Sequence, residues 1–256
     1  MTHNDISPSR RNLLKSMSTL PFVGAFAALQ AREALAAGGV SALIASPYGP
    51  IAPVNDLTTG LPLLQLPAGF TYKSFGWTGD TMTDGKPCPA AHDGMGVVLA
   101  RKVGRSTELV LIRNHEAHAV SPNKFINAFG AYDTGASSAG ATTVLGGGTT
   151  NLLFRDGAWV SVTPSLGGTD GNCAGGITPW GTWLSCEEIG SDNVTASGKK
   201  HGYVFEVSPD TTQTTGQPIV GMGRFAHEAA AVDPTTSIVY MTEDSSGKSG
   251  FYRYIP

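Results

Sequence analysis

The stretch Gly202-Tyr203-Val204-Phe205-Glu206-Val207 places a valine beside an aromatic residue, as does Ile238-Val239-Tyr240-Met241-Thr242-Glu243 further along the chain. Alternation of apolar with polar or small residues is typical of a β-strand. The two stretches lie about 36 residues apart, which is close to the length of one four-stranded propeller blade. They therefore favour a β-propeller over a β-sandwich.

Further strand-like segments with turn signals between them continue along the chain. Only 14% of the residues are charged and 33 are glycines, a composition that suits short strands and turns better than amphipathic helices. We predict an all-β, β-propeller-like fold that is incomplete, with about two to three blades of a larger toroid, because a closed propeller needs at least four. Loops are expected at 120–138 and 146–148. The predicted strands are 71–77, 96–102, 108–114, 150–155, 158–163, 181–187, 202–208, 224–232, 238–243 and 251–255.

The N-terminus has the three parts of an export signal. Arg10 and Arg11 lie in Ser9-Arg10-Arg11-Asn12-Leu13-Leu14-Lys15, ahead of a weakly apolar run and the small-x-small site Ala34-Leu35-Ala36. Paired arginines beside such a run predict a twin-arginine signal peptide over residues 1–36; a Sec signal with two incidental arginines is the alternative. We expect export by the twin-arginine machinery to the periplasm or the medium. An irregular arm is expected at 37–66, and a partial β-propeller domain at 67–256.

Charge and hydropathy exclude two classes of partner. The chain has 17 basic and 20 acidic residues, and removal of residues 1–36 increases the acidic excess. A nucleic-acid-binding surface would need a basic face, so none is expected. The apolar run of the signal is too short and too diluted to span a bilayer, and we expect no transmembrane segment in the mature chain.

Polar clusters lie at predicted strand ends and glycine-rich turns, where a rigid scaffold can direct side chains into one cavity. Carboxylates gathered in one place repel one another unless a cation neutralises them. Carboxylate and amide oxygens suit calcium, and a cysteine thiolate adds affinity for iron. Taken singly, an acidic cluster at a strand end is more often a group of solvated turn residues, and a lone histidine is more often a hydrogen-bonded core residue than a ligand. Their repetition favours a metal site. The candidates from these clusters are Asp93, His115, Glu116, Cys173, Glu187, Glu188, His227, Glu228, Glu243 and Asp244.

The three cysteines, Cys88, Cys173 and Cys186, are an odd number, so at least one thiol stays unpaired. The spacing of Cys173 and Cys186 is compatible with either a disulfide or a metal-bound thiolate. Cys173 lies in a glycine-rich segment beside Asp170 and Asn172, which we interpret as a turn open to a cavity. We therefore predict that Cys173 is a free thiol.

The run from Gly168 to Glu188, GTDGNCAGGITPWGTWLSCEE, resembles the core signature of PhoX-type alkaline phosphatases. The segments 113–116, 148–151, 224–228 and 240–244 follow in the order of that family. The resemblance covers about residue 60 to the end, and the twin-arginine signal agrees with it. It implies a propeller-like fold, iron and calcium as cofactors, and hydrolysis of phosphate esters as the activity. Family members are longer, so we expect these 256 residues alone to be inactive.

By position in the family, Cys173 is the thiolate shared by the irons, and Glu116, Glu188, Glu228 and Asp244 are carboxylate ligands. The primary set of Glu116, Cys173, Glu188, Glu228 and Asp244 should then converge in the fold, with Asp93, His115, Glu187, His227 and Glu243 as further candidates. No catalytic residue is assigned. Two readings without iron stay open: a non-catalytic, calcium-stabilised periplasmic propeller and a calcium-dependent, lactonase-like propeller. Neither needs a soft thiolate, so Cys173 separates them from the phosphatase.

Overall fold

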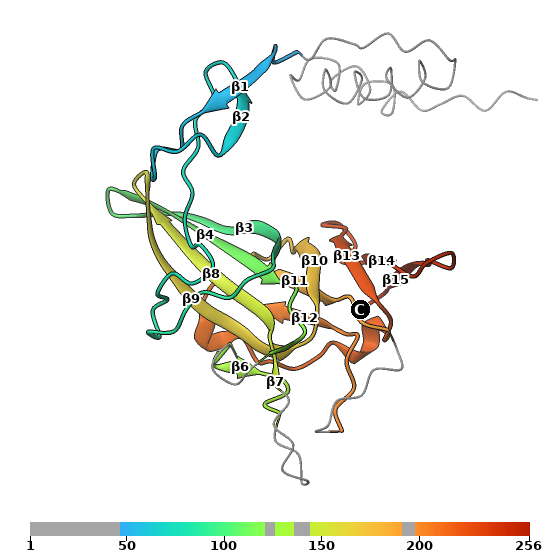
Figure 1. Ribbon diagram of the computed structural model, residues 1–256. Helices are drawn as coiled ribbons and strands as arrows, with labels where there is room; N and C mark the ends of the chain where they lie inside the picture. Colours follow the sequence, from blue (N-terminus) through green and yellow to red (C-terminus); the bar gives the residue numbers. More distant parts are fainter. Residues whose placement is uncertain (1–46, 121–125, 136–143, 191–197) are drawn as a thin grey trace, which may run out of the picture. The chain divides into compact units, whose positions relative to one another are not determined.

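The computed structural model describes residues 47–120, 126–135, 144–190 and 198–256 (Figure 1). The predicted signal peptide with Arg10 and Arg11, the first part of the arm and part of the loop expected at 120–138 lie outside these ranges. Within the described ranges, no helix has the length and apolarity needed to cross a membrane. The chain divides into two compact units, one ending at Ser74 and one from Phe75 to Pro256.

The described part of the first unit is built on a short antiparallel pair, β1 (Ile51–Val54) and β2 (Leu64–Pro67). The Tyr72 hydroxyl donates to the Val54 carbonyl at 2.9 Å, and the Ser74 N–H donates to the Asp56 carboxylate at 2.7 Å. The irregular arm expected at 37–66 therefore contains a regular ladder. The strand predicted at 71–77 is wrong, because Tyr72 and Ser74 bond to the β1–β2 region instead of pairing with a neighbouring strand.

The second unit contains three larger sheets and a small pair, β5 (Ala119–Val120) with β7 (Val144–Leu145). The five-stranded sheet has the order β3-β4-β8-β9-β6, with β6 parallel to β9 and the other neighbours antiparallel. Two three-stranded antiparallel sheets follow, β10-β11-β12 and β13-β14-β15. Short 3-10 turns η2 (Thr211–Gln213) and η3 (Val220–Met222) connect them.

The strands of the five-stranded sheet are β3 (His92–Val103), β4 (Ser106–His115), β6 (Gly130–Ala131), β8 (Gly147–Arg155) and β9 (Ala158–Thr169). The others are β10 (Asn172–Ile177), β11 (Trp183–Glu187), β12 (Val204–Val207), β13 (His227–Val232), β14 (Val239–Glu243) and β15 (Phe251–Tyr254).

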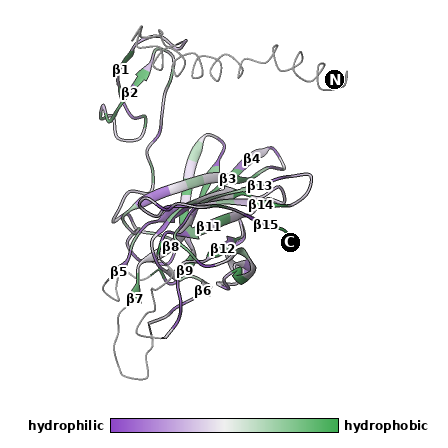
Figure 2. Cartoon of the chain, turned by 90° about the vertical axis from the view of Figure 1, so that its right-hand side faces the viewer, coloured by the Kyte–Doolittle hydropathy of each residue, from purple (hydrophilic) through white to green (hydrophobic). Residues whose placement is uncertain are grey.

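Hydrophobic residues lie along the strands (Figure 2), and the sheets pack against one another through two cores. Val110 and Ile112 of β4 pack with Phe205 of β12 in one core. A second core joins Leu184 of β11 to Met241 of β14. The first strand of the middle sheet, β10, lies beside the first strands of the other two sheets, β3 and β13. Stacked sheets whose first strands adjoin are the arrangement of propeller blades, so the prediction of an all-β, propeller-like and open fold is confirmed.

Two sequence predictions in this unit need correction. The segment around Cys173 is not a turn but the strand β10, and the loop expected at 146–148 is mostly the start of β8. Gly175 and Gly176 hid β10, because glycines carry no alternating apolar signal. They are required by packing: a Cβ on Gly176 would lie 1.8 Å from the Ala230 carbonyl oxygen, and one on Gly175 would lie 1.7 Å from that of Leu184.

Replacement of Gly176 by alanine is expected to push β10 away from β13 and to lower the free energy of unfolding by about 1–3 kcal/mol. The added methyl group would meet backbone, which cannot move aside as a flexible side chain can. Gly190→Ala is the matched control, since a Cβ at Gly190 meets nothing within 4 Å. Urea unfolding of the two variants measures the difference; equal midpoints would show that β10 does not need glycine here.

Candidate metal centre

Three β-bulges place candidate ligands at the point where the first strands of the sheets adjoin. The ladder shifts register between His92 and Met95 in β3, between Asn172 and Gly175 in β10, and between His227 and Ala229 in β13. A bulge leaves an extra residue unpaired and changes the direction of its side chain. The candidate ligands inside these bulges are Asp93, Cys173 and Glu228.

In each sheet, a second candidate ligand follows directly after the second strand. The backbone N–H of this residue donates a hydrogen bond to the carbonyl of the residue that directly precedes the first strand. That carbonyl belongs to the residue two positions before the candidate ligand in the bulge. This bond fixes each of the three carboxylates beside its bulge. We call the repeated arrangement the root motif. The bonds are Glu116 to Ala91 at 2.8 Å, Glu188 to Gly171 at 2.9 Å and Asp244 to Ala226 at 3.1 Å.

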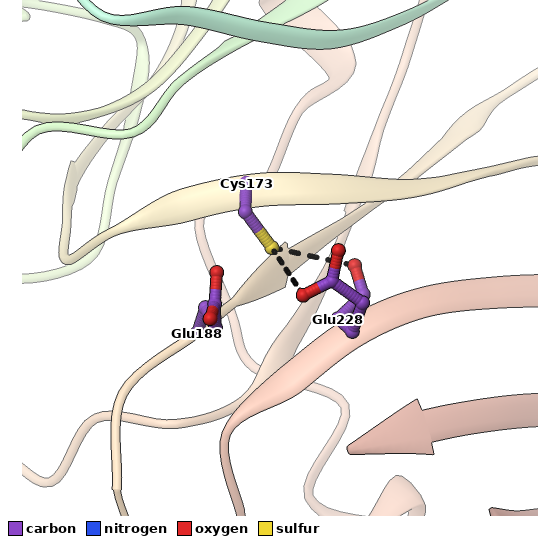
Figure 3. Close-up of side chains that lie close together, drawn as sticks. All are labelled: Cys173, Glu188 and Glu228. Atoms are coloured by element: carbon purple, nitrogen blue, oxygen red, sulfur yellow. Dashed lines mark hydrogen bonds between the residues drawn. The ribbon is translucent and has the colours of Figure 1, made fainter. Parts of the chain in front are cut away.

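At the centre, ligand atoms of Cys173, Glu188 and Glu228 all lie within 4.8 Å of one another. Figure 3 shows the Cys173 thiol directed between the two glutamates. Its Sγ lies 3.3 Å from the Glu228 carbonyl oxygen and 4.0 Å from Oε2 of the same residue. One soft donor and two hard donors thus share a partly buried position.

The charges of this cluster are mutually unfavourable. Burial raises the pKa of the Cys173 thiol well above its usual range, and Glu228 and Glu188 add to the rise. Burial also raises the pKa of Glu188, where Glu228, Glu116 and Asp244 act in the same direction although the Cys173 thiol opposes them. A cation among these groups would relieve the repulsion.

Glu116 belongs to the same electrostatic cluster. Burial raises its pKa, and Asp93 and Glu228 add to this effect while His118 opposes it. The five members of the primary set therefore interact electrostatically, directly or through a neighbour, and their role as metal ligands stays a prediction. Asp93 joins them through its interaction with Glu116.

The remaining four candidates are not among the residues grouped around Cys173 in the described part of the chain. His115, Glu187 and Glu243 directly precede Glu116, Glu188 and Asp244, and successive side chains of a strand point to opposite faces. The His115 ring bonds the Ala90 carbonyl at 2.9 Å, and burial lowers its pKa to about 3. Glu243 accepts from the Tyr252 hydroxyl at 2.8 Å.

Glu187 has a structural role: its fully buried carboxylate accepts hydrogen bonds from a histidine and three backbone N–H groups. His227 packs against the Phe225 ring, with ring centroids 3.6 Å apart. Burial lowers the pKa of His227 to about 4, so this side chain is a core residue.

Asn114 is a positioning residue that the sequence reasoning left without a role. Its Nδ2 donates to the carbonyls of Cys173 at 3.2 Å and Ala174 at 2.7 Å, and so fixes the bulge. Its Oδ1 accepts from Trp183 and Ser185, both at 2.9 Å. The available signal was an asparagine between Arg113 and His115 at the polar end of β4, two residues before a candidate ligand.

The three cysteines are free and buried, which confirms the prediction of a free Cys173 thiol. Cys186 faces the apolar core formed by Leu184 and Val204, whereas Cys173 occupies the bulge. The disulfide alternative for this pair is therefore excluded in this structure.

Comparison with known proteins identifies the family of this chain. The family model for alkaline phosphatase PhoX matches residues 46–165 and 137–256. No curated protein matches the chain. Among solved structures, the chain is similar to Pseudomonas fluorescens PhoX in complex with vanadate, a transition state analogue, with 23% sequence identity and a TM-score of 0.39. The match covers 64% of this chain and 40% of that chain, so this chain spans less than half of its length. By the family match over residues 46–256, the chain belongs to the PhoX alkaline phosphatase family.

Proposed function

We propose that this chain provides metal-binding residues of a phosphate-ester hydrolase that uses iron and calcium. The observation that carries the proposal is the thiol of Cys173 within 4.8 Å of two carboxylates. A soft thiolate among hard oxygens suits a transition metal and has no use in a site for calcium alone. Membership of the PhoX family supports phosphate monoesters or diesters as substrates.

The donor set fits this assignment. Cys173, Glu188 and Glu228 would hold iron, and Asp93, Glu116 and Asp244 offer the oxygen ligands that calcium prefers. Bound cations would stabilise the negative charge that develops on a transferring phosphoryl group. The protein's own contribution is positioning: Asn114 fixes the Cys173 bulge, and the root motif fixes Glu116, Glu188 and Asp244.

Chelation tests the proposal on the complete gene product after it has folded in the cell and been exported. Hydrolysis of p-nitrophenyl phosphate should fall by about two orders of magnitude when a calcium chelator is added, and should return with calcium. Circular dichroism should show an intact fold. The alternative, a non-catalytic propeller stabilised by calcium, predicts no hydrolysis before chelation and unfolding after it.

Metal-induced stabilisation should increase with pH. The raised pKa values of Glu116 and Glu188 mean that the folded, metal-free chain favours their protonated forms. The stability associated with those protons is lost as pH rises through the folded pKa values, whereas metal binding needs the ionised carboxylates. We expect a larger rise in Tm on adding calcium at about pH 8 than at about pH 5. A Tm rise independent of pH would show that calcium binds elsewhere.

We further propose export by the twin-arginine route, supported by Arg10 and Arg11 in the signal sequence. Replacement of both arginines by lysine should leave the precursor in the cytoplasm, as measured by cell fractionation and immunoblotting. A Sec signal depends on basic charge alone, so under that alternative the double-lysine precursor would be exported as before.

A further inference from the structure

A buried guanidinium lies on the face of β4 opposite Val110 and Ile112 of the first core, away from the proposed metal centre. Arg113 is 3% exposed, and its Nη1 donates to the Gly76 carbonyl at 3.1 Å. Its Nη2 lies 3.2 Å from the Cys88 sulfur and 3.5 Å from the Thr150 hydroxyl. In the part of the chain that the structure describes, Arg113 Nε has no hydrogen-bond partner and no carboxylate forms an ion pair with this guanidinium. Buried charges are normally paired, and Cys88 is the contacting group that can become an anion.

The charged surroundings of Cys88 favour an anion more than a cation. His92 Nε2 lies 3.9 Å from the sulfur. Asp80 raises the pKa of the thiol, but less than Arg113 lowers it. The fixed positive charge of Arg113 opposes a metal cation at this sulfur. The same charge stabilises a thiolate, the form in which cysteine is nucleophilic.

Cys88 is 2% exposed and lines a cavity. Its side chain forms part of the wall of an apolar cavity of about 230 Å³, together with Pro87, Ala90, Ala117 and Gly146. This volume exceeds the space that one water molecule occupies and admits other molecules of similar size. The sulfur is 25 residues from Arg113 in sequence, yet it joins the guanidinium to the residues that line this cavity.

The other cysteines lack this combination. Burial raises the thiol pKa of Cys88, Cys173 and Cys186, but a neighbouring cation opposes the rise at Cys88 alone. Cys173 faces carboxylates, and Cys186 is enclosed by the apolar core. Reactivity of a thiol follows its access and its tendency to ionise.

We propose that Cys88, with Arg113 as its counter-charge, is a site of oxidation by small peroxides. The sulfur attacks one peroxide oxygen, an S–O bond forms and the O–O bond breaks. The sulfur loses two electrons to the peroxide. The departing oxygen takes up the thiol proton and leaves as water when the oxidant is hydrogen peroxide, and the product is a sulfenic acid. This inference does not depend on the proposed phosphatase activity.

The test is peptide mapping of the complete protein, with its metals retained, after brief exposure to hydrogen peroxide and a dimedone probe. The dimedone adduct should form on the Cys88 peptide before the Cys173 and Cys186 peptides. Reaction at Cys173 or Cys186 while Cys88 stays unmodified would overturn the proposal. This measurement needs no variant and therefore cannot be confused by misfolding.

Two variants test whether the guanidinium and the cavity cause the expected reactivity of Cys88. Arg113→Gln removes the charge and keeps hydrogen-bonding capacity, and should slow labelling of Cys88 by about tenfold or more, because a nearby opposite charge shifts a pKa by about one to three units. Ala117→Leu should narrow the cavity and slow the same labelling while Arg113 is retained. Unchanged labelling rates in both variants, with folding verified by circular dichroism, would contradict the roles of the guanidinium and the cavity.

Discussion

Cys173→Ser in the complete gene product is expected to remove iron and to lower phosphate-ester hydrolysis by about two orders of magnitude or more, with the fold retained. Serine keeps nearly the same shape, but its hydroxyl stays protonated at neutral pH and is a poor ligand for iron. The variant leaves Glu188 and Glu228 in place, so the loss would report the thiolate itself. Metal analysis and the rate on p-nitrophenyl phosphate measure the two effects.

Cys186→Ser is the matched control, since Cys186 lies on the neighbouring strand but faces the apolar core. It should lower stability without changing the ratio of iron to protein. Normal iron content and activity in Cys173→Ser would contradict the proposed role of the thiolate. They would favour one of the calcium-only readings.

Glu187→Gln is expected to lower the free energy of unfolding by about 3 kcal/mol, because it breaks a buried charged network. The Glu187 carboxylate is 0% exposed and accepts from Asp170 N at 2.9 Å, Gly202 N at 2.8 Å and Tyr203 N at 3.0 Å. It also bonds His201 Nδ1 at 2.6 Å. Burial disfavours the charged form of His201, but Glu187 and Asp133 outweigh it and raise the pKa of the ring. The amide of glutamine would direct donor hydrogens at one or more of these donors.

Glu188→Gln, at the adjacent residue, should lower metal content without lowering the stability of the metal-free protein. Its raised pKa shows that the ionised form is unfavourable in the metal-free fold, so removal of the charge should not destabilise that form. The same change should lower metal content, because an amide is a weaker ligand than a carboxylate. Chemical denaturation of both variants after metal removal, together with metal analysis before it, distinguishes the two roles. Equal destabilisation by both substitutions would show that Glu187 is not the structural member of the pair.

Alternation of apolar and polar residues indicated β12 and β14, whereas β4 is marked by the continuous apolar run from Leu109 to Ile112. All three strands contribute to the cores between the sheets. Alternation failed at β10, where Gly175 and Gly176 carry no pattern and exist to admit the backbones of β11 and β13. It also failed at 71–77. Hydrogen bonds from the Tyr72 hydroxyl and the Ser74 N–H hold this segment against the β1–β2 region, and the spacing of apolar residues does not reveal such bonds.

The chemistry of the site was more predictable than its geometry. Acidic residues at strand ends indicated where the ligands lie, but could not separate Glu187 from Glu188 or Glu243 from Asp244. Which member of each pair faces the cluster depends on where the strand ends and the bulge begins, and a shift of one residue reverses the two faces. Asn114 escaped assignment for a related reason, since its role is defined by carbonyls 59 and 60 residues away in sequence.

The root motif has an evolutionary consequence. Positions 93, 173 and 228 are occupied by an aspartate, a cysteine and a glutamate, yet each lies in the same kind of bulge and beside the same backbone bond. The main chain thus holds the position of each candidate ligand, while the side chain differs from sheet to sheet. Under the proposed function, exchange of one such residue would change the preferred cation without a change of fold. The three sheets offer equivalent ligand positions, and the thiol in the middle sheet would add affinity for iron to a site otherwise suited to calcium.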